Sequence, residues 1–228
     1  MKKIQLPNVT LFAVACTKVE ETIFALKKSM EGIQFARAIL ITHEKIDLSS
    51  FGIEVYTIEK LDYKGYNHFI LYRAYEYIQT EYSLLVQNDG YILHPKQWDP
   101  VFLQYDYIGA PWESNIHFTE EGKNIRVGNG GFSLRSKKLL NLFIEKPDLS
   151  FTDNNTGFFH EDGIISVYHR TKLESYGIQF APVSIASRFS RETVCDDSVY
   201  LPFGFHNKRS LSWTIYIRVF LKKIGITI

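Results

Sequence analysis

The chain has 228 residues, of which 45% are hydrophobic and 22% are charged, and its formal net charge is +1. This composition is typical of one globular domain and excludes a dedicated nucleic-acid binder, which usually carries a clear basic excess. The two cysteines, Cys16 and Cys195, are too few for a disulfide framework or a zinc site. They are typical of a reducing compartment, so we expect a cytoplasmic protein.

The N-terminal stretch has a superficial likeness to a secretion signal. Lys2 and Lys3 precede an apolar run from Val9 to Cys16. The run is short, however, and charged residues follow it at once, beginning with Lys18. A buried strand is therefore the better interpretation. Nowhere does the sequence approach the ~20 consecutive apolar residues that a membrane span requires.

The first ninety residues alternate between strand-like apolar runs and helix-like periodicity. The predicted strands cover 9–16, 35–42, 53–58 and the run that ends before Gln87, and the predicted helices cover 19–30 and 66–79. This alternation predicts right-handed βαβ units and a parallel sheet.

The second half is less regular. It predicts a short strand at 105–112, a polar surface loop at 113–124, helices at 137–145 and 164–173, and a flexible loop at 147–160. We find no internal repeat or linker, so residues 1–207 are predicted to form one domain. In the tail, 208–228, apolar residues at helical spacing lie beside basic ones. This pattern predicts an amphipathic helix that either lies on an anionic membrane surface or packs on the domain or a partner subunit.

The stretch Tyr82–Leu93 is the most informative part of the sequence. Its apolar run ends in Gln87, Asn88, Asp89 and a glycine. Ligands of open α/β sheets bind beyond the carboxyl ends of such strands, where Asp89 would hold a divalent cation against a phosphate. Asn-Asp-Gly between apolar runs also predicts a hairpin. The preceding alternation favours the first interpretation, because parallel strands are joined by crossovers.

Three later motifs allow two interpretations each. Gly128, Gly130 and Gly131 permit a close approach or a positive φ, or form a bulged turn before a helix. The acidic pair at 161–162 either caps a helix or supplies a general base. His206, among aromatic residues, is either a packing residue or a partner for a carboxylate around a metal such as manganese.

Together and in this order, these motifs resemble the GT-A class of nucleotide-sugar glycosyltransferases. The chain is most similar to small bacterial and viral members marked by Gln-x-Asp-Gly, Tyr-Ile-Gly-Ala-Pro-Trp, Gly-Asn-Gly-Gly-Phe and Glu-Asp. The similarity spans residues 9–207. It implies an α/β fold with a GT-A-like, Rossmann-type nucleotide-binding sheet and helices on both faces.

The resemblance also implies roles for individual residues. Asp89 and His206 would hold Mn²⁺ or Mg²⁺, whereas Gln87 replaces an aspartate of the family motif and is a weak metal ligand. Asp162 would deprotonate the acceptor hydroxyl, with Glu161 as its neighbour or an acceptor contact. The nucleotide-sugar donor would contact Ala15, Cys16, Thr17, Tyr66, Asn67, Arg73, Gln87, Asn88 and Asp89. The sugar and acceptor would contact Trp112, Asn129, Gly130, Gly131 and Phe132.

The function that the resemblance implies is hexosyl transfer from a UDP-sugar to a glycan or lipid-linked acceptor, with inversion. Two alternatives remain open. A catalytically weakened sugar- or nucleotide-binding module would account for Gln87. A nucleotidyltransferase shares the α/β architecture, but the sequence lacks an N-terminal glycine-rich loop with a basic residue. Neither the net charge nor the motifs predict a nucleic-acid partner.

Overall fold

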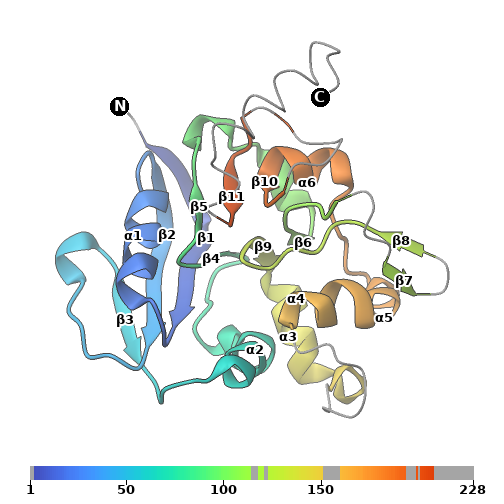
Figure 1. The fold of residues 1–228 in the computed structure, drawn as a ribbon, viewed down its shortest axis with the longest axis horizontal. Helices are drawn as coiled ribbons and strands as arrows, with labels where there is room; N and C mark the ends of the chain where they lie inside the picture. The colour runs from blue at the N-terminus through green and yellow to red at the C-terminus, as the bar shows by residue number, and fades with distance from the viewer. Residues whose placement is uncertain are drawn as a thin grey trace.

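The protein is built on a central six-stranded sheet with the strand order β3-β2-β1-β4-β9-β6 (Figure 1). The computed structural model describes residues 3–113, 118–120, 123–150, 160–193, 199 and 201–207. The strands of this sheet are β1 (Ile4–Ala15), β2 (Ile33–Thr42), β3 (Glu54–Thr57), β4 (Tyr82–Val86), β6 (Tyr107–Ile108) and β9 (Phe132–Ser136). The first four run parallel, whereas β9 pairs antiparallel with both β4 and β6. The sheet is therefore mixed but mainly parallel.

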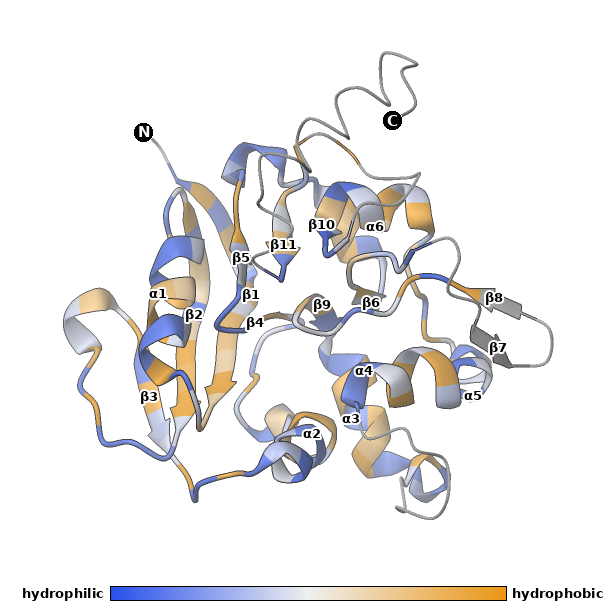
Figure 2. Cartoon of the chain, viewed as in Figure 1, coloured by the Kyte–Doolittle hydropathy of each residue, from blue (hydrophilic) through white to orange (hydrophobic). Residues whose placement is uncertain are grey.

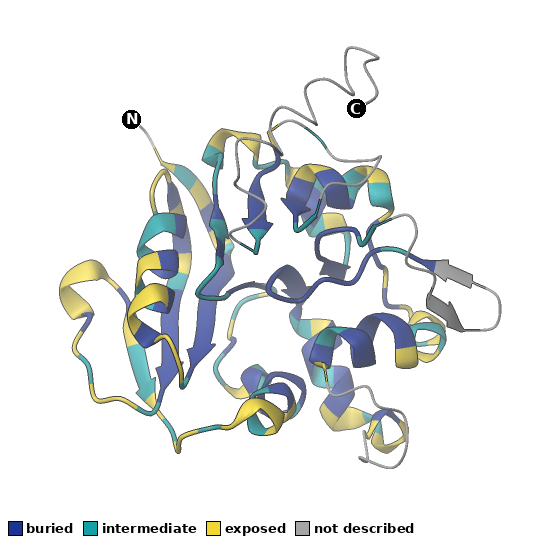
Figure 3. Ribbon diagram, in the orientation of Figure 1, coloured by how far each residue is buried: buried dark blue, intermediate teal, exposed yellow. Residues whose placement is uncertain are grey.

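Apolar side chains on both faces of the sheet are buried. In β1, Leu11 and Ala13 belong to one core, and Phe12 and Val14 belong to another. The first core includes residues of helix α1 (Val19–Ser29), and the second includes residues of α2 (Tyr63–Tyr72) and α3 (Lys137–Glu145). Figures 2 and 3 show these strands as apolar and buried, and the outer face of α1 as exposed. The prediction of an α/β fold with helices on both faces is confirmed.

The turn after β4 leads the chain from the large sheet into a second one. The amide of Gly90 donates to the Gln87 carbonyl at 3.1 Å, so the turn is tight. However, β5 (Gly90–Ile92) does not extend the sheet of β4. It pairs antiparallel with β11 (Gly204–His206), which pairs in parallel with β10 (Ser190–Arg191). The stretch Tyr82–Leu93 therefore contains the end of one strand and then enters a second sheet. The pairing of β5 with β11 brings His206 opposite Gly90.

Two predicted helices have different bounds in the structure. The helix predicted at 66–79 begins earlier because the Asp62 side chain accepts the Gly65 amide at 2.7 Å, which caps α2. It also ends earlier, and a 3₁₀ turn, Ala74–Glu76, follows. The helix predicted at 164–173 is a composite of α4 (Glu161–Gly163), a π-helical segment (Ile164–Tyr168) and α5 (Arg170–Ser175).

Several elements of the second half were absent from the sequence-based expectations. The segment predicted as a polar loop contains the antiparallel pair β7 (Phe118–Glu120) and β8 (Lys123–Ile125). Helix α6 (Val183–Phe189) precedes β10. Strand β9 covers the residues predicted only as a turn before a helix. Its five residues are all buried, because it pairs with β4 and β6 on either side.

Some predictions fall on residues outside the described ranges. They concern most of the loop at 147–160 and the whole tail, 208–228, so the domain boundary and the amphipathic helix stay predictions. Within the described ranges, no helix has the length and apolar character needed to cross a membrane.

Candidate active site

Two adjoining cavities lie at the carboxyl ends of β1 and β4. The first has a volume of about 450 Å³ and is lined by the end of β1, the beginning of α1 and the turn after β4. Six residues predicted to bind the nucleotide line it: Ala15, Cys16, Thr17, Tyr66, Gln87 and Asn88. The structure therefore collects, in one cavity, residues that lie up to about seventy positions apart in the sequence.

The second cavity, of about 430 Å³, is lined by most of the groups predicted to carry chemistry, with the exception of Asp89. Its lining includes Asn67, Trp112, Asn129, Gly131, Glu161, Asp162 and His206. The two cavities share Tyr63, Tyr66 and Gln87. A ligand with two parts can therefore occupy both cavities across Tyr66 and Gln87.

Four predicted site residues are absent from the linings of both cavities. Asp89 and Gly130 lie beside the second cavity, where they contact its lining residues His206 and Asp162. Phe132 and Arg73 lie elsewhere. Phe132 is fully buried in the core, with its ring centroid 5.2 Å from that of Phe189 and 6.0 Å from that of Phe203. Arg73 is half exposed beyond the end of α2, where it pairs with Glu76. Neither lines the cavities. The sequence motif alone assigns Phe132 to the site together with the neighbouring glycines. In the structure Phe132 belongs to a strand, and the alternation of side chains along that strand directs its ring into the core.

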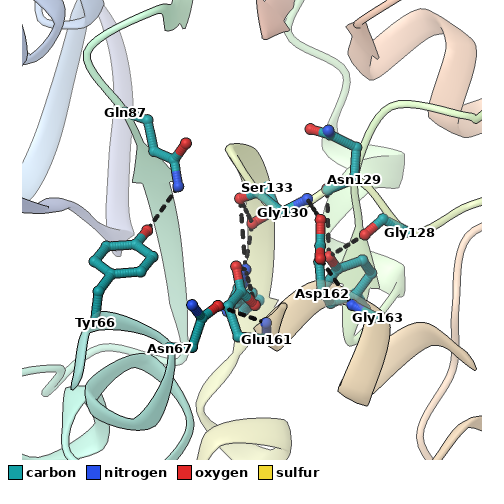
Figure 4. Close-up of polar contacts among 12 residues, drawn as sticks. Tyr66, Asn67, Gln87, Gly128, Asn129, Gly130, Ser133, Glu161, Asp162 and Gly163 are labelled. Atoms are coloured by element: carbon teal, nitrogen blue, oxygen red, sulfur yellow. Dashed lines mark hydrogen bonds and ion pairs between the residues drawn. The ribbon is translucent and has the colours of Figure 1, made fainter. Parts of the chain in front are cut away.

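Gln87 and Tyr66 form a contact at the junction of the cavities. Gln87 Nε2 donates to the Tyr66 hydroxyl at 2.7 Å, and the Gln87 carbonyl oxygen is turned away from Tyr66 (Figure 4). Burial raises the pKa of Tyr66, so its hydroxyl stays neutral. Gln87 is thus held by its nitrogen and presents a neutral acceptor, which suits a ligand hydroxyl better than a cation.

Asp162 is held by the glycine-rich segment. Its Oδ2 accepts the Gly130 amide at 3.0 Å and its Oδ1 accepts the Gly163 amide at 2.8 Å (Figure 4). Each oxygen keeps a lone pair for another partner. The side chain lines the second cavity.

The three glycines of this segment serve close approach rather than a positive φ. A Cβ on Gly128 would lie 2.1 Å from the Trp112 ring, and one on Gly130 would lie 2.4 Å from Glu161 Oε1. Among the described residues, the glycines with positive φ are Gly32, Gly52 and Gly177. Each glycine at 128, 130 and 131 therefore leaves room for a side chain of the site.

Glu161 has a buried partner that the sequence analysis missed. The Arg135 guanidinium lies 2.9 Å from the Glu161 carboxylate, and both side chains are buried. Burial raises the pKa of Glu161, and the charge of Arg135 opposes this rise. The Glu161 amide donates to Asn67 Oδ1 at 2.7 Å. The ion pair thus fixes the beginning of α4 and, with it, Asp162. The sequence signal for Arg135 is a charge inside a strand that contains no other charged residue.

His206 lies between two carboxylates. Its Nε2 is 3.4 Å from Asp89 Oδ1, and its Nδ1 is 3.4 Å from Glu192 Oε1 and 3.1 Å from Asn129 Nδ2. Burial alone would lower the pKa of His206, but hydrogen bonding and charge from Asp89 and Glu192 raise it to about 9. The same contact with His206 lowers the pKa of Asp89. Glu192 carried no sequence signal, because it lies in no motif.

The donor set at Asp89 and His206 fits a divalent cation in part. A carboxylate oxygen and an imidazole nitrogen face each other, and the neighbouring Gln87 contributes only a neutral amide. The described residues contain no group of three or more His, Cys, Asp or Glu side chains that would hold a metal. The pair therefore suits an ion such as Mg²⁺ or Mn²⁺ that completes its shell with water and phosphate oxygens.

Comparisons with known proteins give a matching family model and similar solved structures. A search of curated proteins found no match. The chain is similar to the "crystal structure of a glycosyltransferase involved in the glycosylation of the major capsid of PBCV-1", with 15% identity, a TM-score of 0.48, and coverage of 87% of this chain and 92% of that chain. A family model described as a protein of unknown function (DUF5672) matches residues 52–206, a range that includes β4, the glycine-rich segment, Asp162 and His206. Because this match covers more than half of the chain, the protein belongs to the DUF5672 family.

Proposed function

We propose that the protein is a glycosyltransferase that moves a hexosyl unit from a nucleotide-diphosphate sugar, a UDP-sugar, to a hydroxyl of a glycan or lipid-linked acceptor. The observation that carries this proposal is the pair of cavities that meet at Tyr66 and Gln87. The first is bounded by strand ends and the beginning of a helix, where nucleotides bind in α/β sheets. The second has a carboxylate, Asp162, and a histidine–carboxylate pair in its wall or beside it.

Each residue has a defined part in this reaction. Asp162 accepts the proton of the acceptor hydroxyl, whose oxygen forms the new bond to the anomeric carbon from the face opposite the leaving group. The bond from that carbon to the diphosphate oxygen breaks, and the nucleoside diphosphate leaves. The result is inversion, since one displacement occurs at an oxocarbenium-like centre.

The nucleoside would occupy the first cavity, with a sugar hydroxyl on Gln87 Oε1. Asp89 and His206 would hold Mn²⁺ or Mg²⁺, which, when bound, stabilises the charge of the leaving diphosphate as a Lewis acid. Gln87 is uncharged, so Asp89 is the carboxylate of the turn that we assign to the metal. Glu161 is assigned to positioning Asp162, because its own carboxylate is occupied by Arg135.

Binding of UDP measured by calorimetry with and without Mn²⁺ tests the proposal. We expect Mn²⁺ to strengthen UDP binding, and Asp89→Ala and His206→Ala each to abolish most of that gain. Glu31→Gln, which removes an exposed carboxylate paired with Lys28, is the matched control and should behave as the wild type. If UDP binding is independent of Mn²⁺ in the wild type, the metal role is wrong.

Analysis of the nucleotide released from UDP-sugars separates the function classes. A glycosyltransferase releases UDP, and slow hydrolysis of the correct donor is expected even without an acceptor. A binding module releases nothing. A nucleotidyltransferase, supplied with a nucleoside triphosphate and a sugar phosphate, releases pyrophosphate. Release of pyrophosphate, or of no nucleotide from any donor, would overturn the proposed reaction.

A further inference from the structure

The environment of His206 depends on a residue that no motif includes. Both ring nitrogens face acidic side chains, Asp89 at Nε2 and Glu192 at Nδ1, each at 3.4 Å. The side chains of His206 and Glu192 are mostly buried, with exposed fractions of 17% and 21%. Glu192 follows β10, whereas His206 ends β11, so the pairing of these strands sets their approach.

A ring that ligates a cation is a neutral imidazole, and its two tautomers differ in what they allow at Asp89. If the hydrogen is on Nε2, the ring donates to Asp89 and has no lone pair for a cation there. If the hydrogen is on Nδ1, the Nε2 lone pair faces Asp89 and is free to ligate. A carboxylate is only an acceptor, so Glu192 favours the tautomer with the hydrogen on Nδ1.

The amide of Asn129 is consistent with both tautomers. As placed, Asn129 Nδ2 lies 3.1 Å from His206 Nδ1, while its Oδ1 is buried without a hydrogen-bond partner among the described residues. Rotating the amide by half a turn would exchange these atoms and let Oδ1 accept from Nδ1. Asn129 therefore adapts to the ring, whereas Glu192 does not. Asp89 favours a hydrogen on Nε2 in the same way, but not when its oxygens bind a cation. Glu192 is then the carboxylate that determines the tautomer.

We propose that Glu192 is a positioning residue of the cation site: it accepts the Nδ1 hydrogen of His206 and so directs the Nε2 lone pair to the ion held by Asp89. Ligating histidines commonly donate their other ring hydrogen to a carboxylate, and loss of that partner typically weakens metal binding about 10–100-fold. This inference rests on the proposed metal role of Asp89 and His206. With only two protein ligands, the site is especially sensitive to the orientation of one of them.

Mn²⁺-dependent UDP binding in three variants tests this role. We expect Glu192→Ala to weaken UDP binding in the presence of Mn²⁺ by about 10–100-fold. UDP binding without metal should stay as in the wild type. Glu192→Gln keeps an acceptor oxygen and should lose less. Glu31→Gln is again the control.

A spectroscopic measurement addresses the tautomer directly. Long-range ¹H–¹⁵N spectra of the imidazoles, with the His206 signal identified by its loss in His206→Ala, should show the hydrogen on Nδ1 when Mg²⁺ and UDP are bound. Glu192→Ala should reduce the population of this tautomer. A purely structural role for Glu192 would change stability without moving this signal.

Failure of the role proposed for Glu192 can be distinguished from failure of the proposed metal role. One outcome is that the wild type binds UDP tightly only with Mn²⁺ and that Glu192→Ala binds UDP with the same affinity and the same dependence on Mn²⁺. In that case the proposed metal role stands, but Glu192 is not a positioning residue. If the wild type and Asp89→Ala bind UDP equally with and without Mn²⁺, the metal role fails and this inference fails with it.

Discussion

Gly131 lies so close to His206 that a Cβ at position 131 would be 2.1 Å from Nε2 of the imidazole. The two residues are seventy-five positions apart, on the glycine-rich segment and on β11. The same segment donates the Gly130 amide to Asp162 and places the Asn129 amide beside His206. One short stretch of backbone thus supports both the proposed cation site and the proposed base.

Gly131→Ala should therefore displace the His206 ring. Overpacking of this kind costs typically about 1–3 kcal/mol of stability. We also expect Mn²⁺-dependent UDP binding to weaken about tenfold or more, since Nε2 would no longer face Asp89. Calorimetry and thermal unfolding measure both effects. The control is Gly131→Ala in a His206→Ala background, where the methyl group has no ring to contact and should cost less stability. An equal loss of stability in both backgrounds would show that close packing against His206 is not the cause.

Asp162→Asn should lower turnover about 10²–10⁴-fold while UDP binding stays unchanged. The asparagine keeps one carbonyl oxygen for the Gly130 amide, so the segment should keep its place. Initial rates with the correct donor and acceptor, and calorimetry with UDP, separate the two effects. A parallel loss of UDP affinity would show that Asp162 is a helix cap and not the base.

Tyr66→Phe should weaken UDP binding by roughly threefold to tenfold, because the Gln87 amide loses the hydroxyl that holds its Nε2 at 2.7 Å. A hydrogen bond of this kind contributes about 0.5–1.5 kcal/mol. Tyr176→Phe is the matched control, since its hydroxyl bonds to the exposed Asp148 and lies in neither cavity. If Tyr66→Phe and Tyr176→Phe both bind UDP as the wild type does, the orientation of Gln87 does not depend on Tyr66.

His169 should make the fold less stable in mild acid. It is 4% exposed, and burial lowers its pKa from 6.5 to about 4. Below pH 6.5, His169 therefore binds a proton in the unfolded state but not in the folded state. The free energy of unfolding consequently falls until the pH reaches about 4. A shift of this size corresponds to about 3 kcal/mol.

Urea unfolding at pH 7.5 and pH 5 tests this prediction. His169→Gln, which cannot gain a proton, should lose less stability between the two pH values than the wild type does. His68→Gln, at an exposed position in α2, should behave as the wild type. If His169→Gln and the wild type lose the same stability, other groups account for the acid sensitivity.

Local sequence patterns were sufficient for the parallel half of the fold. The strands around Leu11 and Leu84 are continuous apolar runs because both of their faces are buried, and such runs are visible without any tertiary information. Helix α1 was predicted for a similar reason, since its buried residues recur at helical spacing. The collection of Cys16 and Gln87 in one cavity follows from the same topology, which brings the carboxyl ends of parallel strands to one edge.

Only the tertiary structure decided what the glycines and the charged residues outside the motifs do. A glycine is compatible with a positive φ, a bulge or a close approach, and Gly131 takes the third option because a ring from β11 fills the space of its missing Cβ. Arg135 and Glu192 have partners twenty-six and fourteen positions away, in other elements. Such contacts depend on how strands pair and helices pack, and no local spacing encodes them.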